Sequence, residues 1–310
     1  MVILNYFIMC LIFGTTFLAI KIGVDAGLPS FFSAGIRFFI AGILLYSFMV
    51  WKGKVPLKLV FRKEMLITGV CLTFGTFATL YWAEQYVTSG VAAVLSATGP
   101  MMILAINTIL LKHKGSKISV LGCVLGIIGV TFLILPGLSF KMSYLWVIGC
   151  VVIVIGEAFY ATGTIYAKHV IGKFKTISPI ALNAAQMLHG GLLLMILSFF
   201  TENIELKNFQ STASLSSLIY LIVFGSMVGH SLYYWLVSRT NPVFPSTWLY
   251  ISPIIAVIIG VIFYNEYISW LTGVGVLSIL IGSLLVNFET LQKLLKRKRN
   301  LNHVISAERY

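Results

Sequence analysis

Long apolar stretches separated by short polar ones run along almost the whole chain. Ten of these stretches approach the ~20 residues that an α-helix needs to cross a bilayer, and few charges interrupt them. This pattern predicts an all-α integral membrane protein with ten transmembrane helices and no sizeable soluble domain. The predicted spans are 2–22, 30–51, 64–84, 89–111, 117–135, 144–166, 178–200, 214–237, 243–264 and 269–288.

The composition indicates the same class of protein. Of the 310 residues, 59% are hydrophobic and 10% are charged, with a mean hydropathy of +0.98, whereas soluble domains carry about 25% charged residues. The first span has no basic segment before it and no small-residue cleavage motif after it. We therefore expect it to remain as a membrane helix and not to act as a cleaved signal peptide.

Lysine and arginine are distributed unevenly over the loops between the predicted spans. If the N-terminus is cytoplasmic, the inner segments hold eighteen of the 22 Lys and Arg residues, and the outer segments hold only Lys21, Lys141 and Lys207. Because basic loops stay in the cytoplasm, this asymmetry predicts a multi-pass protein of the cytoplasmic membrane with both termini inside. The basic residues behind the net charge of +13 then serve to orient the chain in the membrane and to contact anionic lipid. No nucleic-acid partner is expected.

The second half of the sequence repeats the first. An offset of 153 residues places Pro100 on Pro253, and an offset of 147 places Lys21 on Lys168. Five spans separate the equivalent positions. Because five is odd, equivalent helices run in opposite directions, so the halves form an inverted-topology repeat. The predicted units are a first repeat at 1–140, a second repeat at 141–288 and a basic cytoplasmic tail at 289–310.

Pro100 and Pro253 each stand near the middle of an apolar span. Proline removes a backbone N–H and crowds the preceding turn, at a cost of ~3 kcal/mol in a helix interior. Counted at ~1.5 Å per residue, both prolines lie about 15 Å deep, at the bilayer midplane. Paired interruptions at that depth are typical of a substrate cavity between inverted halves. The alternative is that each proline only kinks its helix for packing.

Several motifs, spread over 1–290, carry a family resemblance. They are FGTTFLAIKIG in the first span, FSAGIRFFIAGILL in the second, YVTSGVAAVLSATGPMMILAIN in the fourth, YATGTIYAKHVIG in the sixth and VFPSTWLYISPIIAVIIGVIFYNEYISWLTGVGVLSILIGSLLV across the last two. In their order, duplication and span count, the chain resembles the ten-span EamA-type members of the drug/metabolite transporter superfamily. The resemblance implies two five-helix bundles around a central cavity and export of small metabolites, amino acids among them.

The chain departs from the family pattern at two places. Family members often close the fourth and ninth spans with a glutamate; Glu266 keeps that acid in the second half, but His113 stands at the equivalent position in the first. The usual tryptophan before glycine in the first span is Phe13, and its counterpart is Tyr160. These departures weaken any transfer of substrate identity from other family members.

Glu157 is an acidic residue deep in the membrane, thirteen residues into the sixth span. An unpaired carboxylate there costs roughly several kcal/mol, so we expect it to face the bundle interior. It either lines the cavity, where it holds a substrate amine or exchanges a proton, or is a protonated acid bonded to a neighbouring helix. Tyr160 and Thr164 follow it at helical spacing and share its face.

Further cavity residues are expected on the first span and at midplane depth. Gly14, Phe17 and Lys21 share one face, which we expect to oppose the Glu157 face across the cavity. Such a stripe in a membrane helix is also compatible with simple packing. The remaining candidates are polar groups near the midplane and a histidine in the eighth span: Thr15, Ser96, Thr98 and His230.

Two aromatic pairs, Tyr81-Trp82 and Tyr234-Trp235, are equivalent in the two halves. They stand near opposite membrane faces, where interfacial aromatic belts occur, and a belt is the favoured interpretation. The alternative is a gate at each mouth. Arg37, which aligns with Gln186, is expected to be structural, reaching outward or pairing with a carboxylate.

Glycines in the fifth and tenth spans are expected to allow close helix approach within the protein. They are Gly122, Gly126, Gly129, Gly275 and Gly282.

The sequence has no phosphate-binding glycine loop, metal-ligand cluster or nucleophile–base set, so neither enzyme activity nor a cofactor or metal is expected. We expect a secondary transporter of a small metabolite, an amino acid or related compound or an amphipathic drug, that works by alternating access. The alternatives are a receptor or scaffold, or an importer or exchanger of another metabolite class. Substrate, direction, proton coupling and oligomeric state stay open.

Overall fold

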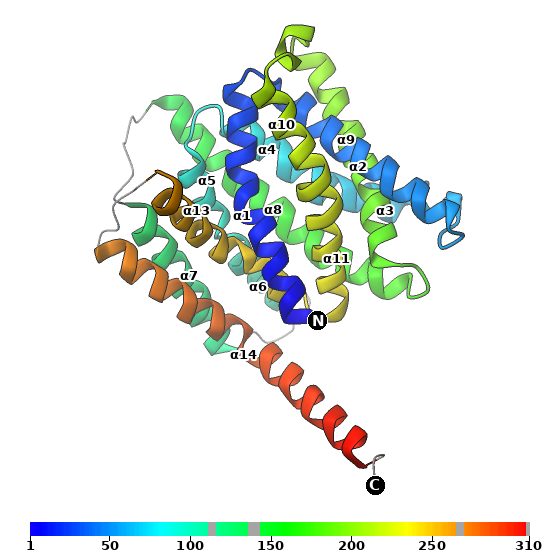
Figure 1. The fold of residues 1–310 in the computed structure, drawn as a ribbon, viewed down its shortest axis with the longest axis vertical. Helices are drawn as coiled ribbons and strands as arrows, with labels where there is room; N and C mark the ends of the chain where they lie inside the picture. Colours follow the sequence, from blue (N-terminus) through cyan, green and yellow to red (C-terminus); the bar gives the residue numbers. More distant parts are fainter. Residues whose placement is uncertain (111–115, 136–142, 265–269, 308–310) are drawn as a thin grey trace.

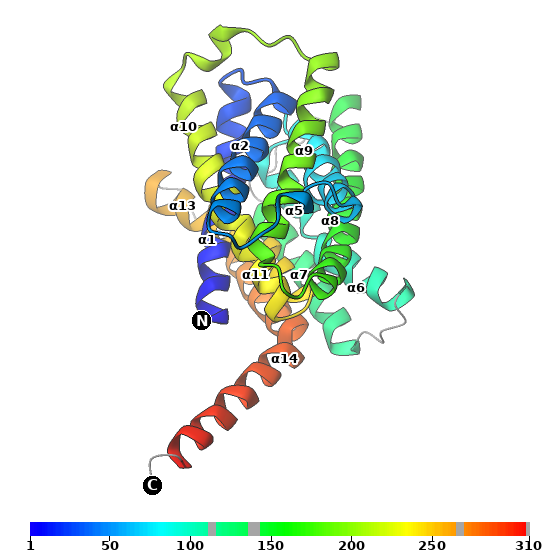
Figure 2. The same cartoon turned by 90° about the vertical axis from the view of Figure 1, so that its right-hand side faces the viewer.

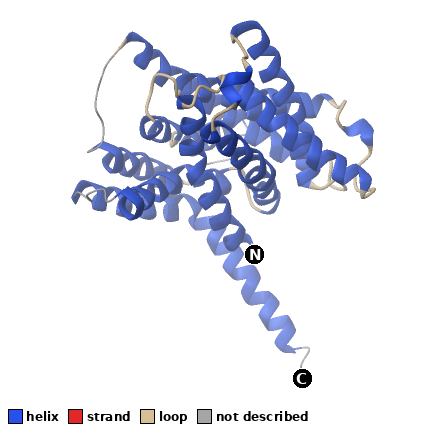
Figure 3. Ribbon diagram, turned by 45° about the horizontal axis from the view of Figure 1, so that its top comes forward, coloured by secondary structure: helices blue, strands red, loops and turns tan. Residues whose placement is uncertain are grey.

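The computed structural model describes residues 1–110, 116–135, 143–264 and 270–307, and in these ranges the chain is helical without strands (Figures 1 and 3). Eight helical segments are long and apolar enough to cross a membrane, and two further apolar helices are shorter. Together they correspond to the ten predicted spans, and the all-α membrane fold is confirmed. The continuous helices are α1 (Val2–Asp25), α2 (Ser30–Trp51), α7 (Lys117–Ile134), α8 (Tyr144–Lys173), α9 (Pro179–Thr201) and α14 (Trp270–Ala307).

The third and eighth spans each contain a π-helical segment in their middle. In the third span, α3 (Lys63–Thr68) leads through π-helical Gly69–Gly75 into α4 (Thr76–Ala83). The eighth span repeats this order. Its parts are α10 (Thr212–Tyr220), π-helical Leu221–Gly229 and α11 (His230–Arg239). Under the offset of 153 the first π segment falls on residues 222–228, within the second, and such segments are frequent at functional sites.

The fourth and ninth spans are interrupted as well. The fourth span consists of α5 (Ser89–Ser96) and α6 (Gly99–Leu110), so Pro100 occupies the first turn of a new helix, where its missing N–H costs little. The ninth span consists of α12 (Val243–Ser246) and α13 (Trp248–Tyr264). Here the expected match is wrong, because Pro253 lies inside α13 and the interruption comes earlier, at Thr247.

Equivalent helices of the two halves pack against each other through glycine. A Cβ atom on Gly122 of α7 would lie 2.7 Å from the carbonyl oxygen of Gly282 in α14. A Cβ atom on Gly35 of α2 would lie 3.0 Å from the carbonyl oxygen of Gly191 in α9. The backbones therefore approach within contact distance in both pairs. The predicted close approach of the fifth and tenth spans is thus found inside the chain.

Both ends of the chain lie at one end of the bundle. The N-terminus and the final part of α14 emerge on the same side, and α14 projects well beyond the other helices (Figures 1 and 2). This helix carries the basic sequence KLLKRKR past its apolar part. An even number of crossings requires such an arrangement.

We expect Gly122→Ala to lower the melting temperature of the detergent-solubilised protein. The added methyl group would meet main-chain atoms of α14, the nearest at 2.6 Å, and overpacking of this kind costs roughly 1–3 kcal/mol. Gly172→Ala is the matched control, because no atom lies within 4 Å of a Cβ there. Equal melting temperatures for the two variants would show that the α7–α14 contact does not limit stability.

Candidate functional site

A cavity of about 50 Å³ lies between the two halves of the molecule. The first span, the interrupted third and fourth spans, α8, α11 and the start of α13 all contribute to its wall. Five of the predicted cavity residues line it, and they come from four different spans. They are Phe17, Ser96, Glu157, Tyr160 and His230.

Glu157 reaches from α8 into the interruption of the fourth span. Its side chain is 6% exposed, and the Ser96 hydroxyl at the end of α5 lies within hydrogen-bonding reach of its carboxylate. The second carboxylate oxygen, Oε2, has no hydrogen-bond partner among the described residues. It lies against Gly99, where a Cβ atom would collide with it. The absence of a side chain at Gly99 thus makes room for the acid.

Aromatic rings form much of the remaining wall. Trp248 is central to this group: its ring centroid lies 4.6 Å from that of Phe13 and 6.0 Å from that of Phe17, and its indole N–H donates to the Tyr160 hydroxyl at 3.3 Å. The ring centroid of Tyr160 in turn lies 5.9 Å from that of Tyr233. The cavity therefore has apolar, polarisable faces with one acidic group between them.

A buried cation, Arg37, lies on the cavity wall as well. Its guanidinium donates from Nε to the Ser226 hydroxyl at 2.8 Å and from Nη1 to the Tyr81 hydroxyl at 3.1 Å, and the side chain is 1% exposed. Arg37 therefore does not reach outward, and among the residues that the structure describes it has no carboxylate partner, so neither expected contact is found. Its ring neighbours, Phe38 at 4.6 Å and Phe77 at 5.2 Å, add cation–π contacts.

The repeat extends to the contact made by Arg37. Its counterpart Gln186 accepts a hydrogen bond from the Thr73 hydroxyl at 2.8 Å. Thr73 and Ser226 are equivalent under the offset of 153, and each belongs to a π-helical segment. The second span of each half is therefore tied to the π-helical segment of the other half.

Other predicted cavity residues lie beside the cavity and not on its wall. Thr164 bonds the hydroxyl of the lining residue Tyr233 at 2.8 Å, and a Cβ atom on Gly14 would meet the Ile255 side chain of α13. The Thr15 hydroxyl contacts that of Tyr220 in α10. The Thr98 hydroxyl donates to the main-chain oxygen of Leu95, one turn back in the chain. Pro100 and Pro253 are buried, but neither lines the cavity.

The two aromatic pairs divide into inward tyrosines and partly exposed tryptophans. Tyr81 and Tyr234 are 1% and 2% exposed, and Tyr234 lines the cavity. An interfacial belt therefore does not describe the tyrosines. Trp82 packs on Tyr86 and Trp235 lies under the Arg239 guanidinium, both half-buried. The two positions of the family glutamate, His113 and Glu266, lie outside the described residues.

Sequence reasoning missed Arg37, Tyr233 and Trp248 as cavity residues. Tyr233 follows His230 by three residues, so helical spacing from His230 indicates it. Trp248 stands directly after the interruption at Thr247, and Pro242 and Pro245, shortly before that break, are the sequence signal for it. For Arg37, the signal was its depth in the membrane, because a buried cation in a span usually faces protein or a cavity.

Two inverted halves, interrupted central spans, and a cavity at their junction that is lined by a buried acid and a buried arginine define the class: a membrane transporter fold. The model of the EamA-like transporter family matches residues 1–135 and again residues 147–288. The chain belongs to this family.

Individual relatives agree with this assignment. A protein of Escherichia coli K12 described as "uncharacterized inner membrane transporter YedA" is 30% identical over 286 residues, covering 90% of this chain and 89% of its own. An "uncharacterized transporter" of Buchnera aphidicola is 28% identical, with 93% and 95% covered. Protein PagO of Salmonella typhimurium is 26% identical, with 89% and 90% covered. A solved crystal structure superposes with a TM-score of 0.75 at 15% identity, over 92% of this chain and 96% of the other, and shows the fold alone.

We expect Gly99→Ala to destabilise the protein, and to do so less in a Glu157→Ala background. The new methyl group would collide with the Glu157 carboxylate and come within 2.9 Å of Leu249 Cδ1, so removing the carboxylate relieves part of the clash. Contacting residues show coupling energies of roughly 0.5–3 kcal/mol in a double-mutant cycle. The cycle is measured by unfolding in detergent. Additive effects of the two substitutions would contradict the contact.

Proposed function

We propose that this protein is a secondary transporter that exports a small metabolite across the cytoplasmic membrane by alternating access to the cavity between its halves. The observation that carries the proposal is the Glu157 carboxylate, buried in the lining of that cavity at the interruption of the fourth span. Unpaired acids inside a membrane protein mark substrate or proton pathways. The family assignment supports transport, and the inverted repeat supports a site that opens to either side in turn.

Glu157 has one of two roles in this proposal. It holds an amine of the substrate, or it takes up and releases a proton during the cycle. The free Oε2 atom supports both roles, because it is the oxygen for which the described residues supply no donor. A substrate ammonium would donate to it, whereas a proton bound to Oε2 would remove the negative charge that otherwise lacks a donor.

The substrate in the proposal is a small, partly apolar molecule: an amino acid or a related compound, or an amphipathic drug. The wall formed by Phe13, Phe17 and Trp248 supports an apolar portion, and Glu157 supports a cationic one. The volume of the cavity, about 50 Å³, is far below the ~300 Å³ of a ligand pocket. We therefore propose that the structure represents a contracted state between two open ones.

The proposal also includes the orientation of the chain in the membrane. Because the basic loops are expected on the inside, we propose that both termini lie in the cytoplasm.

The first test compares the medium of four cultures by mass spectrometry: cells overproducing the protein, Glu157→Gln or Glu289→Gln, and cells with an empty vector. Glu289 is an exposed acid on α14 and serves as the matched control. We expect one compound or class of compounds to accumulate with the unmodified protein and with Glu289→Gln, and not with Glu157→Gln. An identical medium in all four cultures would contradict export.

The accumulated compound then serves as substrate for reconstituted vesicles that contain only this protein. We expect Glu157→Gln to lower its flux and to flatten the dependence of flux on pH, because the amide neither titrates nor binds an ammonium as a carboxylate does. An unchanged rate together with an unchanged pH profile would remove Glu157 from the mechanism.

A further inference from the structure

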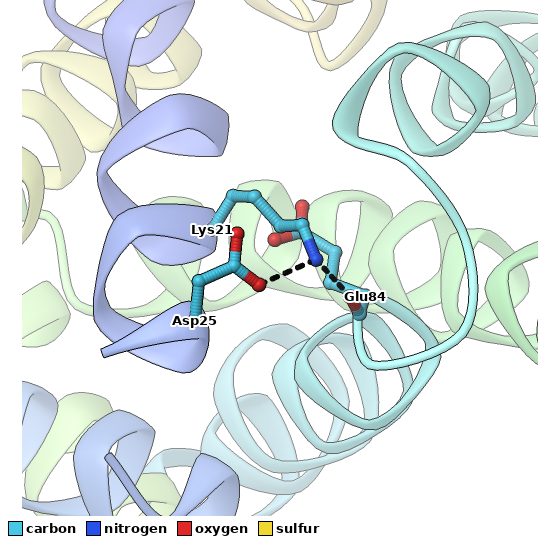
Figure 4. A network of polar contacts seen from close by, with 3 residues as sticks. All are labelled: Lys21, Asp25 and Glu84. Atoms are coloured by element: carbon cyan, nitrogen blue, oxygen red, sulfur yellow. Dashed lines mark hydrogen bonds and ion pairs between the residues drawn. The ribbon is translucent and has the colours of Figure 1, made fainter. Parts of the chain in front are cut away.

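Lys21 binds the end of a neighbouring helix at one end of the cavity. It stands in the last turn but one of α1, and its ammonium donates to the main-chain oxygen of Glu84 at 3.2 Å. Glu84 follows directly after α4 and is the capping residue at its C-terminus. Figure 4 shows the ammonium between this oxygen and the carboxylate of Asp25, 2.7 Å away on α1 itself. The contact joins α1 to the end of the third span.

Lys168 makes the corresponding contact at the other end of the molecule. It stands near the end of α8, and its ammonium donates to the main-chain oxygens of Val237 at 2.7 Å, Ser238 at 3.2 Å and Thr240 at 2.8 Å. These residues form the last turn of α11 and its cap. A helix C-terminus carries unpaired carbonyl groups and a partial negative charge, and a lysine satisfies both.

The two contacts are equivalent under the internal repeat. Lys21 aligns with Lys168 at the offset of 147, and the acceptor Glu84 aligns with the acceptor Val237 at the offset of 153. The acceptor side chains are unlike each other, a carboxyl and an isopropyl group. What both halves retain is therefore a lysine on a main-chain carbonyl at a helix end.

Each lysine stands beyond the cavity wall, toward the end of its own helix. Lys21 follows the lining residue Phe17 by one helical turn, and Lys168 follows the lining residue Tyr160 by about two turns, with Thr164 between them bonded to the lining residue Tyr233. Because the halves are inverted, the two lysines lie at opposite mouths. Both contacts are present in the same structure, in which the cavity has about 50 Å³.

We propose that Lys21 and Lys168 are the gating residues of this cavity, one at each mouth. This inference rests on the transport function proposed above. A mouth opens when the first helix of one half separates from the end of the third helix of the same half, and that movement breaks its lysine contact. With both contacts formed the cavity is closed at both ends, and alternating access requires one to break while the other holds.

The test measures access to the cavity and needs no substrate. In a background with the four native cysteines replaced, Thr16→Cys places one thiol on the cavity wall, where Thr16 is 6% exposed. A membrane-impermeant maleimide is applied to oriented vesicles from either face. Lys21→Met and Lys168→Met each remove one contact. Hydrogen bonds to a charged group shift such an equilibrium by on the order of tenfold.

We expect Lys21→Met to raise the labelling rate about tenfold from one face and Lys168→Met to raise it about tenfold from the opposite face. Lys54→Met, at an exposed lysine, should leave both rates unchanged. Labelling that rises from the same face in both variants, or in neither, would overturn the proposal. If a methionine variant is not recovered as monodisperse protein, the leucine variant, which also lacks a hydrogen-bond donor, replaces it with the same expectation.

This outcome is independent of the export experiment. If the two lysine variants raise the labelling rate from opposite faces but no compound is exported, Lys21 and Lys168 are gating residues and the proposed export is wrong. If a compound is exported but the labelling rates do not rise from opposite faces, the export proposal holds and Lys21 and Lys168 are not its gating residues.

Discussion

In a bilayer, every main-chain N–H and C=O group needs a partner from the protein, and this requirement limits where a spanning helix can be interrupted. Four spans of this chain are interrupted, two by π-helical segments and two by breaks between helices. All four supply residues that line the cavity, and so do the regular helices α1, α8 and, through Arg37, α2, whereas α7 and α14 pair elsewhere. The π-helical segment Leu221–Gly229 reaches the outside of the bundle, where Val223, Phe224 and Val228 are exposed. The two breaks, at Ala97 and Thr247, are buried, and there the protein can supply partners for the freed backbone groups.

Much of this fold could be predicted from the sequence, because membrane spans follow from runs of apolar residues and internal repeats follow from matched residues at a constant offset. Apolar length gave ten segments, and the matched prolines and lysines indicated the duplication. The π-helical segments could not be predicted, since a π turn depends on one extra residue per turn and, apart from Val70 and Val223, no aligned positions of Gly69–Gly75 and Leu221–Gly229 are identical. The interruption at Thr247 was also missed, although Pro242 and Pro245 stand shortly before it. Pro253, where the interruption was expected, lies inside α13.

The site was predictable only where a residue is out of place in lipid. Glu157 and His230 could be predicted as lining residues because a polar side chain inside a membrane span usually faces protein or a cavity. Phe17 was predicted from its position on one helical face with Gly14 and Lys21, and Ser96 from its depth near the midplane. Arg37 was noticed but misinterpreted: its partners, Ser226 and Tyr81, lie in other spans at distances along the chain that spacing does not reveal. Its counterpart Gln186 makes the equivalent contact without a charge. The repeat therefore preserves the hydrogen bond and places a cation in one half only, so the two halves contribute unequal charge to the cavity wall.

The glycine contacts between equivalent helices follow a reciprocal rule. Gly122 contacts Gly282 and Gly129 contacts Gly275, and each contact turns into the other when the halves are exchanged. The pairs Gly35 with Gly191 and Gly42 with Ala184 are related in the same way, at an offset of 149. A surface whose contacts are exchanged by a two-fold rotation is the self-complementary surface of a symmetric dimer. Each half thus carries both sides of the interface that holds it to the other, and a half-length chain inserted in both orientations would have what it needs to assemble as an antiparallel dimer.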